Sequence, residues 1–418
     1  MENLRKILKQ INWDFFDYNS SKYPLDISSI PWYLATFPAP IPKFLIGLLT
    51  ESGETVLDPF GGAGTTCYEA IKQNRLFLYN DINPFVAEMV SALVLAARLV
   101  VQAPSCLKDL TSRDAVTLQN ISLWEDESPY TAEEYRVERD LEEALAKRHI
   151  TSDAAHWYHR KTLIELLAIW DLIHDQGENP EICKIRKLAF SNILKETCSQ
   201  RDHFTYITDN CKPKKLVYIN ALKAYTAMMQ RIDLSTTELS RNYQTLNEDN
   251  RLDVVIDRSV IRNGDARDLS WIQDESVDFV LTSPPYLCAQ DYIKTMRLQD
   301  LFFHGEDLAQ LATSEIGARA KRKGNRNRVV DTFYQDIHTS ISEINRVLKS
   351  GKYFCMIIGQ GKGKITHGID TVSAIRKDIL DSFSFELFFE TVRKISYKTV
   401  RIGGVDTETL LIFKKAPK

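Results

Sequence analysis

The stretch Thr55-Val-Leu-Asp-Pro-Phe-Gly-Gly-Ala-Gly-Thr-Thr66 decides the fold of this chain. It reads as a short apolar strand that ends at Asp58, a turn with glycines at 61, 62 and 64, and a helix that begins near Thr66. Glycine lets a backbone approach a ligand closely, and the free N–H groups at a helix start favour a carboxylate or a phosphate. The stretch therefore predicts a strand–turn–helix unit that can hold a cofactor.

A second predicted strand, Leu76–Asn80, leads into Asp81, which lies 23 residues after Asp58. An acidic residue at about 20 residues beyond such a glycine turn commonly binds ribose hydroxyls. The pair fits a dinucleotide or S-adenosylmethionine. A structural turn without a ligand is one alternative. NAD binding is another, although the turn departs from the Gly-x-Gly-x-x-Gly pattern of NAD-binding folds.

The third feature is Thr282-Ser-Pro-Pro-Tyr286, which directly follows a predicted buried strand, Val277–Leu281. In open α/β sheets, ligands bind outside the carboxyl ends of the strands. Two consecutive prolines fix their own φ angles and restrict the residue before each of them, so the backbone carbonyls point in set directions. Alone, the segment is more typical of a proline-stiffened turn. Behind a buried strand and together with the glycine turn, it indicates a substrate site.

Together the two segments resemble the amino-methyltransferases of DNA, which transfer a methyl group from S-adenosylmethionine to the exocyclic nitrogen of cytosine or adenine. The resemblance covers roughly residues 31–90 and 255–418. It implies an α/β fold: a Rossmann-like methyltransferase sheet with helices on both faces and a terminal antiparallel hairpin. It also implies S-adenosylmethionine as the cofactor, with Asp81 on the ribose, Asp265 facing the adenine, and the segment from Phe37 to Pro42 at the methionine end. The implied cofactor-binding residues are Phe37, Pro38, Asp58, Phe60, Gly61, Gly62, Gly64, Thr65, Asp81 and Asp265.

For catalysis the resemblance points to Ser283, Pro284, Pro285 and Tyr286. An exocyclic amine is a poor nucleophile because its lone pair is delocalised into the ring. The Ser283 hydroxyl and the Pro284 carbonyl would accept its two hydrogens, and Tyr286 would stack on a base flipped out of the duplex. The mechanism requires no metal and no covalent nucleophile. Serine at the first position is more typical of N4-cytosine enzymes, and Asn or Asp of N6-adenine enzymes, so cytosine is preferred and adenine is the alternative.

The remaining apolar runs alternate between strand and helix patterns, which indicates a sheet flanked by helices. Further strands are predicted at Val260–Asn263, Tyr353–Ile358, Leu387–Ile395 and Thr409–Phe413, and helices at Ile41–Thr50, Cys67–Gln73, Phe85–Leu99 and Ile337–Leu348. Between about 105 and 250 the alternation stops, and helical spacing appears at Trp157–His174 and Ile182–Thr197. We therefore expect a catalytic domain of residues 1–105 and 251–418, interrupted by a mostly helical insertion, 106–250, that is the candidate target-recognition region.

A basic stretch, Ala318–Arg328, looks like a loop that contacts DNA phosphates. Its basic residues are Arg319, Lys321, Arg322, Lys323, Arg326 and Arg328, and it has no acidic residue. A solvated charged loop is the alternative, and the net charge of −3 means that any DNA contact must be local. Lys212–Lys215 either faces DNA or solubilises a helix end, while Tyr292, Arg297 and Gln299 either line a base pocket or pack.

Length and composition are ordinary for a globular protein: 418 residues, 44% hydrophobic and 26% charged. The longest apolar run, Phe85–Ala103, is interrupted by Glu88 and Arg98 and reads as a buried helix, so we expect no membrane segment and a cytoplasmic location. The seven cysteines are dispersed, and Cys198, His203 and Cys211 lack a fourth ligand, so no metal site is expected.

The partner implied is duplex DNA with its target base flipped, and the setting a restriction–modification system whose cognate endonuclease acts separately. RNA methylation and a non-catalytic nucleic-acid-binding module are two competing interpretations of the same motifs.

Overall fold

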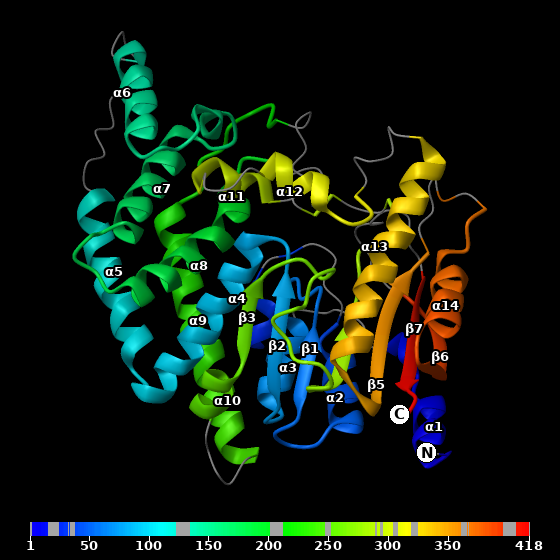
Figure 1. Cartoon of the computed structure of the whole chain (residues 1–418). Helices are drawn as coiled ribbons and strands as arrows, with labels where there is room; N and C mark the ends of the chain where they lie inside the picture. The colour runs from blue at the N-terminus through cyan, green and yellow to red at the C-terminus, as the bar shows by residue number, and fades with distance from the viewer. Residues whose placement is uncertain are drawn as a thin grey trace.

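Seven strands form a single sheet in the order β3-β2-β1-β4-β5-β7-β6 (Figure 1). The computed structural model describes residues 2–15, 25–31, 33, 38–122, 134–200, 212–246, 252–288, 291–292, 296–303, 308–318, 325–360, 366, 368–395 and 407–417. Strands β3, β2, β1, β4 and β5 run parallel, and β7 pairs antiparallel with both β5 and β6. The predicted α/β sheet with a terminal antiparallel hairpin is therefore confirmed. The strands are β1 Thr55–Asp58, β2 Leu76–Asp81, β3 Val260–Asn263, β4 Val277–Thr282, β5 Leu348–Gly359, β6 Phe385–Lys394 and β7 Thr407–Lys415.

Helices cover both faces of the sheet because successive side chains of each buried strand point to opposite faces. Val56 and Phe279 pack in one apolar cluster with α2, α3 and α4, whereas Leu57 and Val280 pack in a second cluster with α13 and α14. The helices that flank the sheet are α1 Glu2–Gln10, α2 Pro40–Leu49, α3 Thr65–Lys72, α4 Pro84–Gln102, α10 Leu252–Arg258, α13 Arg326–Val347 and α14 Thr371–Ser382. Short 3-10 turns lie at η1 Trp13–Phe15 and η3 Ile27–Ser29.

Residues 106–246 contain no strand within the ranges that the structure describes. Their helices are α5 Cys106–Ser122, α6 Glu134–Lys147, the 3-10 turn η4 Ser152–His156, α7 Arg160–Ile173, α8 Pro180–Thr197 and α9 Ala221–Leu246. Helices α8 and α9 pack directly against α4, and Figure 1 shows the group gathered on one side of the sheet. The division of the chain into a catalytic domain and an insertion stays a prediction. Two further helices, α11 Arg297–Phe302 and α12 Leu308–Ser314, follow β4.

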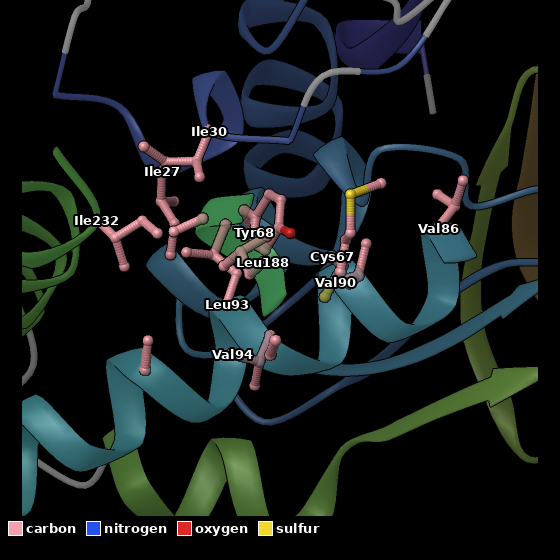
Figure 2. Packing of buried hydrophobic residues seen from close by; sticks show 14 of the residues in the cluster. Ile27, Ile30, Cys67, Tyr68, Val86, Val90, Leu93, Val94, Leu188 and Ile232 are labelled. Atoms are coloured by element: carbon pink, nitrogen blue, oxygen red, sulfur yellow. The ribbon is translucent and has the colours of Figure 1, made fainter. Parts of the chain in front are cut away.

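Helix α4 is the part of the core that joins the sheet to this helical group. Its Val86, Val90, Leu93 and Val94 meet side chains of α3, α8, α9 and η3 (Figure 2). Among the described residues, α4 is the helix that is long and apolar enough to cross a membrane. However, 61% of its most apolar 18-residue segment is buried inside the protein. The apolar run at Phe85–Ala103 is thus a buried helix, as its sequence predicts.

Two predicted boundaries were wrong by five residues or more. Strand β5 begins at Leu348, five residues before the predicted start at Tyr353, because Leu348 already pairs with Val277 of β4. Helix α13 begins at Arg326, well before the predicted Ile337, because the Asn325 side chain caps it by accepting the N–H of Asn327. The end of the basic stretch is therefore helical, and was not recognised because its polar first turns carry little apolar periodicity.

Candidate active site

The carboxyl ends of four neighbouring parallel strands carry most of the predicted site residues. In sheet order, Asp265 follows β3, Asp81 ends β2, Asp58 ends β1, and Ser283 follows β4. The backbone links these ends laterally, since the N–H of Gly264 donates to the carbonyl of Asp81 at 2.9 Å. Residues more than 200 positions apart in sequence thus meet along one edge of the sheet, where open α/β folds bind ligands.

The glycine turn is packed tightly against β2. A Cβ atom at Gly61 would lie 2.3 Å from the ring of Tyr79, which leaves no room for any side chain. Gly64 has a φ of 81° and forms the N-terminal boundary of α3, a conformation that L side chains rarely adopt. The Tyr79 hydroxyl donates to the Gly62 carbonyl at 2.8 Å. The turn is therefore held in one shape by its neighbours.

Asp58 connects the glycine turn to the Ser-Pro-Pro-Tyr segment. Its Oδ1 accepts the Thr282 hydroxyl at 2.6 Å, and its Oδ2 accepts the Thr66 hydroxyl at 2.7 Å. The side chain is almost fully buried, and this burial raises the pKa of Asp58 to about 6 despite the two hydroxyl donors and the N–H of Phe60. Sequence reasoning missed the part played by Thr282, a buried hydroxyl at the end of an otherwise apolar strand.

Asp81 closes the other side of the turn. Its Oδ2 accepts the N–H of Gly62 at 2.8 Å and its Oδ1 accepts the N–H of Asn83, also at 2.8 Å. Burial raises the pKa of Asp81 to about 6, against the lowering effect of these two bonds. A carboxylate has about four acceptor positions, so Asp81 keeps capacity for two further donors, such as the hydroxyls of a ribose.

Asp265 lies beside Asp81 but has a charged partner of its own. Its two carboxylate oxygens accept hydrogen bonds from the Arg267 guanidinium, which also pairs with Asp336 of α13 at 2.7 Å. This pairing orients Asp265 at the end of β3. The predicted contact of Asp265 with an adenine ring stays a prediction.

The Ser-Pro-Pro-Tyr segment is linked to the terminal hairpin. The Ser283 and Tyr286 hydroxyls lie 3.3 Å apart, and the Tyr286 hydroxyl donates to Oε1 of Glu408 at 2.8 Å. Glu408 is the second residue of β7, and its Oε2 pairs with Arg393, the residue directly opposite on β6. The sequence offered no signal for these two residues, because their position depends on strand pairing more than 100 residues downstream of Tyr286.

Two aromatic rings lie next to the turn. Tyr33 and Tyr292 are stacked with ring centroids 6.2 Å apart, and a Cβ atom at Gly62 would lie 3.3 Å from the Tyr33 ring. The Tyr33 hydroxyl is deeply buried, which raises its pKa well above the usual value, with Asp81 and Glu315 adding to the effect. Sequence reasoning missed Tyr33. Of the segment predicted for the methionine end, Pro38 is buried in front of α2, and Phe37 lies outside the described residues.

Other predicted residues attach α11 to the helical group. Gln299 is buried and donates to the Ser191 carbonyl at 3.0 Å, and Arg297 pairs with Asp153 at 2.9 Å. Asp153 also pairs with Lys212 at 2.8 Å, and these donors hold the pKa of Asp153 well below its usual value even though desolvation opposes them. For Arg297 and Gln299 the structure favours packing over the base pocket.

Of the six basic residues proposed to contact DNA, the structure describes the last two. Arg326 and Arg328 are exposed in the first turn of α13. The other four, Arg319, Lys321, Arg322 and Lys323, lie outside the described residues. His203 and Cys211, which were considered as metal ligands, lie outside them too. Ala318, predicted as the start of the loop, is buried, and a Cβ atom at the preceding Gly317 would lie 3.3 Å from the Tyr286 carbonyl.

The residues around the turn fit S-adenosylmethionine. The start of α3 has no side-chain cap, so its N–H groups are available to a carboxylate. Two buried oxygens, Thr65 Oγ1 and Asn80 Oδ1, find no hydrogen-bond partner within the described part of the chain. Buried polar atoms are nearly always satisfied in folded proteins, and a polar ligand at this edge would supply partners for both.

Comparison with known proteins finds similarity to the same family that the sequence motifs resemble. A family model for N6 and N4 methyltransferases, described as "DNA methylase", matches residues 4–92. The type II methyltransferase M.BglI of Bacillus subtilis is 50% identical over 50 residues, which are 12% of this chain and 14% of that protein. The type II methyltransferase M.MjaI of Methanocaldococcus jannaschii is 25% identical over 180 residues, 39% of this chain and 57% of that protein.

The family model spans the glycine turn and Asp81, and the sheet order places the Ser-Pro-Pro-Tyr segment beside both. The chain aligns with less than two thirds of the length of each of these relatives. Motifs, sheet and matches agree with one another: residues 4–92 match the N6 and N4 family of DNA methylases, and further parts of the chain are similar to type II methyltransferases.

Proposed function

We propose that this chain transfers a methyl group from S-adenosylmethionine to the exocyclic N4 of cytosine in duplex DNA. The observation that carries the proposal is the 2.6 Å hydrogen bond from Thr282 to Asp58, because it joins the Ser-Pro-Pro-Tyr segment to the glycine turn. A methyl donor held at the turn and an amine held at Ser283 then share one edge of the sheet.

For this reaction the protein has to position the amine and the methyl donor and to supply hydrogen-bond acceptors for the amine. When bound, S-adenosylmethionine supplies a methyl group on a positively charged sulfur that leaves as a neutral thioether. Ser283 Oγ and the Pro284 carbonyl accept the two amine hydrogens, which favours a tetrahedral nitrogen with its lone pair directed out of the ring plane. The nitrogen forms the new bond to carbon and then releases one proton to solvent. Asp81 holds the ribose, and Asp58 keeps Thr282 in place.

The choice of cytosine rests on Ser283, since serine at this position is more typical of N4-cytosine enzymes in the family. N6-adenine is the alternative within the same mechanism. Tyr286 offers its ring for stacking on the flipped base, a contribution of about 1–3 kcal/mol per base by alanine substitution.

The setting we propose is a restriction–modification system, because both relatives are named type II methyltransferases. The cognate endonuclease would be a separate protein that cleaves the same sequence. The helical group from α5 to α9 is our candidate for target recognition, since its Asp153 and Ser191 contact α11, the helix that follows the Ser-Pro-Pro-Tyr segment.

Expression in a bacterial host that lacks DNA methylation tests the function and the base together. Plasmid DNA from that host would be digested to nucleosides for mass spectrometry, and sequenced by a method that detects modified bases. We expect N4-methylcytosine within one short sequence context. N6-methyladenine would correct the base and keep the mechanism. Methylation confined to RNA, or no methylated nucleoside together with no binding of the cofactor, would contradict the proposal.

A further inference from the structure

A hydrogen-bonded chain of four side chains runs from the terminal hairpin to the candidate catalytic serine. Arg393 and Glu408 face each other on β6 and β7, with a guanidinium nitrogen 2.8 Å from Glu408 Oε2. Glu408 Oε1 lies 2.8 Å from the Tyr286 hydroxyl, which lies 3.3 Å from Ser283 Oγ. Arg393 and Glu408 are nearly buried, with side-chain exposures of 3% and 12%, so water competes little for these bonds.

The chemistry of the four groups fixes the direction of each bond. A guanidinium only donates hydrogen bonds and an ionised carboxylate only accepts them, so the Tyr286 hydroxyl must give its single hydrogen to Glu408. Its oxygen can then only accept, so in the contact between the two hydroxyls Ser283 is the donor and Tyr286 the acceptor. The pKa of Tyr286 is raised well above its usual value, first by burial and then by the charge of Glu408, so this hydroxyl keeps its hydrogen.

We propose that Glu408 and Arg393 are positioning residues that commit the Ser283 hydroxyl hydrogen to Tyr286 and leave the Ser283 lone pairs for the substrate amine. The inference rests on the proposed function, in which Ser283 must accept an N–H of the target base. A serine hydroxyl can otherwise rotate and present its hydrogen to the amine, which would repel the N–H groups. The 3.3 Å contact is long for two hydroxyls, as catalytic hydrogen bonds often are before substrate binds.

The substitution Glu408→Gln tests the direction of the chain with almost no change of shape. Arg393 offers only donors, so the new amide turns its oxygen to Arg393 and its NH₂ group to Tyr286. The Tyr286 hydrogen then points to Ser283 Oγ and occupies a lone pair that the amine needs. We expect kcat to fall roughly tenfold or more, the effect of one misdirected buried hydrogen bond. KM for DNA and Kd for S-adenosylmethionine should remain close to those of the wild type. An unchanged kcat would overturn the proposal.

A second substitution distinguishes a reversed Tyr286 hydrogen bond from a general disruption of the structure. In the double variant Tyr286→Phe, Glu408→Gln there is no Tyr286 hydroxyl that could point its hydrogen at Ser283 Oγ, so Ser283 behaves as it does in Tyr286→Phe alone, with its hydroxyl free to rotate. The double variant should turn over faster than Glu408→Gln alone and at the rate of Tyr286→Phe. If the effects of the two single substitutions on kcat simply add in the double variant, as the effects of independent structural defects do, the assigned role is contradicted.

Glu390→Gln is the matched control, because Glu390 lies on the same hairpin and pairs with Arg376 at 2.6 Å. It should leave kcat unaltered. An equal loss of kcat in this control would assign the effect to the hairpin as a whole and overturn the proposal.

A fluorine resonance from 3-fluorotyrosine at position 286 supplies a readout that needs no catalysis. Glu408→Gln should shift this resonance and Glu390→Gln should not; no shift in Glu408→Gln would overturn the hydrogen-bond chain. If the wild type methylates no DNA, the proposed function fails, and the resonance still decides whether Glu408 orients Tyr286.

Discussion

At the scale of single residues, Asp58 and Asp81 show how similar burial can serve two purposes. Burial raises the pKa of each to about 6. Asp58 receives hydroxyls from Thr66 and Thr282, both parts of the protein, and so works as an internal connector. Asp81 receives two backbone N–H groups and retains acceptor capacity toward the open edge of the sheet. In the proposed function, only Asp81 therefore gains new partners from a ribose.

Cofactor affinity should depend on pH through Asp81. The ribose hydroxyls donate to the ionised carboxylate, which becomes protonated as the pH falls through its pKa of about 6. The Kd for S-adenosylmethionine should be constant near pH 8 and rise toward about tenfold per pH unit below pH 6. Calorimetry in buffers of different ionisation enthalpy should show proton release on binding near pH 6. Asp81→Asn should bind more weakly at pH 8 and lose this proton release, and a pH-independent wild type would contradict the assignment.

Ser283→Ala should separate turnover from cofactor binding. In the proposed reaction the hydroxyl accepts a hydrogen of the amine, so kcat should fall on the order of 10²-fold, as for loss of one preorganised catalytic group. The Kd for S-adenosylmethionine should be unchanged in calorimetry, because Asp58 and Asp81 remain. Ser382→Ala, which alters a hydroxyl bonded to Asp378 on the distant α14, is the control. Equal losses of turnover and cofactor affinity would exclude the role given to Ser283.

At the scale of elements, the contact of β4 with the glycine turn after β1 depends on one buried hydroxyl. Thr282→Val keeps the shape of the side chain and leaves Asp58 Oδ1 without that donor. We expect the free energy of unfolding, measured in urea near pH 7.5, to fall by about 1–3 kcal/mol. Thr245→Val is the control, because Thr245 is exposed on α9 and its hydroxyl bonds only within its own helix.

The same variant has a predictable pH dependence. The folded pKa of Asp58, about 6, exceeds the usual value of 3.8, so ionised Asp58 opposes folding above pH 6 and this cost disappears as the pH falls toward 4. Loss of the Thr282 donor raises that pKa further. The destabilisation of Thr282→Val relative to the wild type should therefore be larger at pH 7.5 than at pH 5. A larger effect at pH 5 would contradict this account of Asp58.

Much of this element structure could be predicted from the sequence, because β1, β2 and β4 are mostly apolar and end in polar motifs. Strand β3 was predicted with its observed bounds, and β1 and β4 each extend one residue further. The missed parts of the site come from pairings across long separations. Glu408 meets Tyr286 only because β7 inserts between β5 and β6, and Asp153 meets Arg297 only because the helical group folds back on α11.

At the scale of the whole molecule, the helical group from α5 to α9 lies on one side of the sheet and α13 lies on the other side (Figure 1). The net charge is −3, so attraction to DNA has to come from a local surface. Arg326 and Arg328 are exposed at the start of α13, which continues the basic stretch that the sequence places directly before it. We expect this end of the molecule to contact phosphates.

Removal of the basic stretch should flatten the salt dependence of DNA binding. Replacement of Arg319, Lys321, Arg322 and Lys323 by glutamine should lower the slope of log K against log salt by about 0.9 for each phosphate that the protein no longer neutralises. Fluorescence anisotropy with duplex DNA between about 50 and 200 mM salt measures the slope. Replacement of the exposed Lys6 and Lys9 of α1 is the control and should leave the slope unaltered. An unaltered slope in the first variant would mean that the stretch is a solvated charged loop that does not contact DNA phosphates.

The central claim is that the glycine turn and the Ser-Pro-Pro-Tyr segment form a single site for methyl transfer. The most direct test incubates the purified chain with labelled S-adenosylmethionine and mixed-sequence duplex DNA, and measures label in the isolated DNA. We predict that the wild type transfers the label to the N4 of cytosine and that Ser283→Ala, with its cofactor still bound, transfers almost none. Cofactor binding without any transfer to DNA by the wild type, under conditions where the duplex is bound, would contradict the claim.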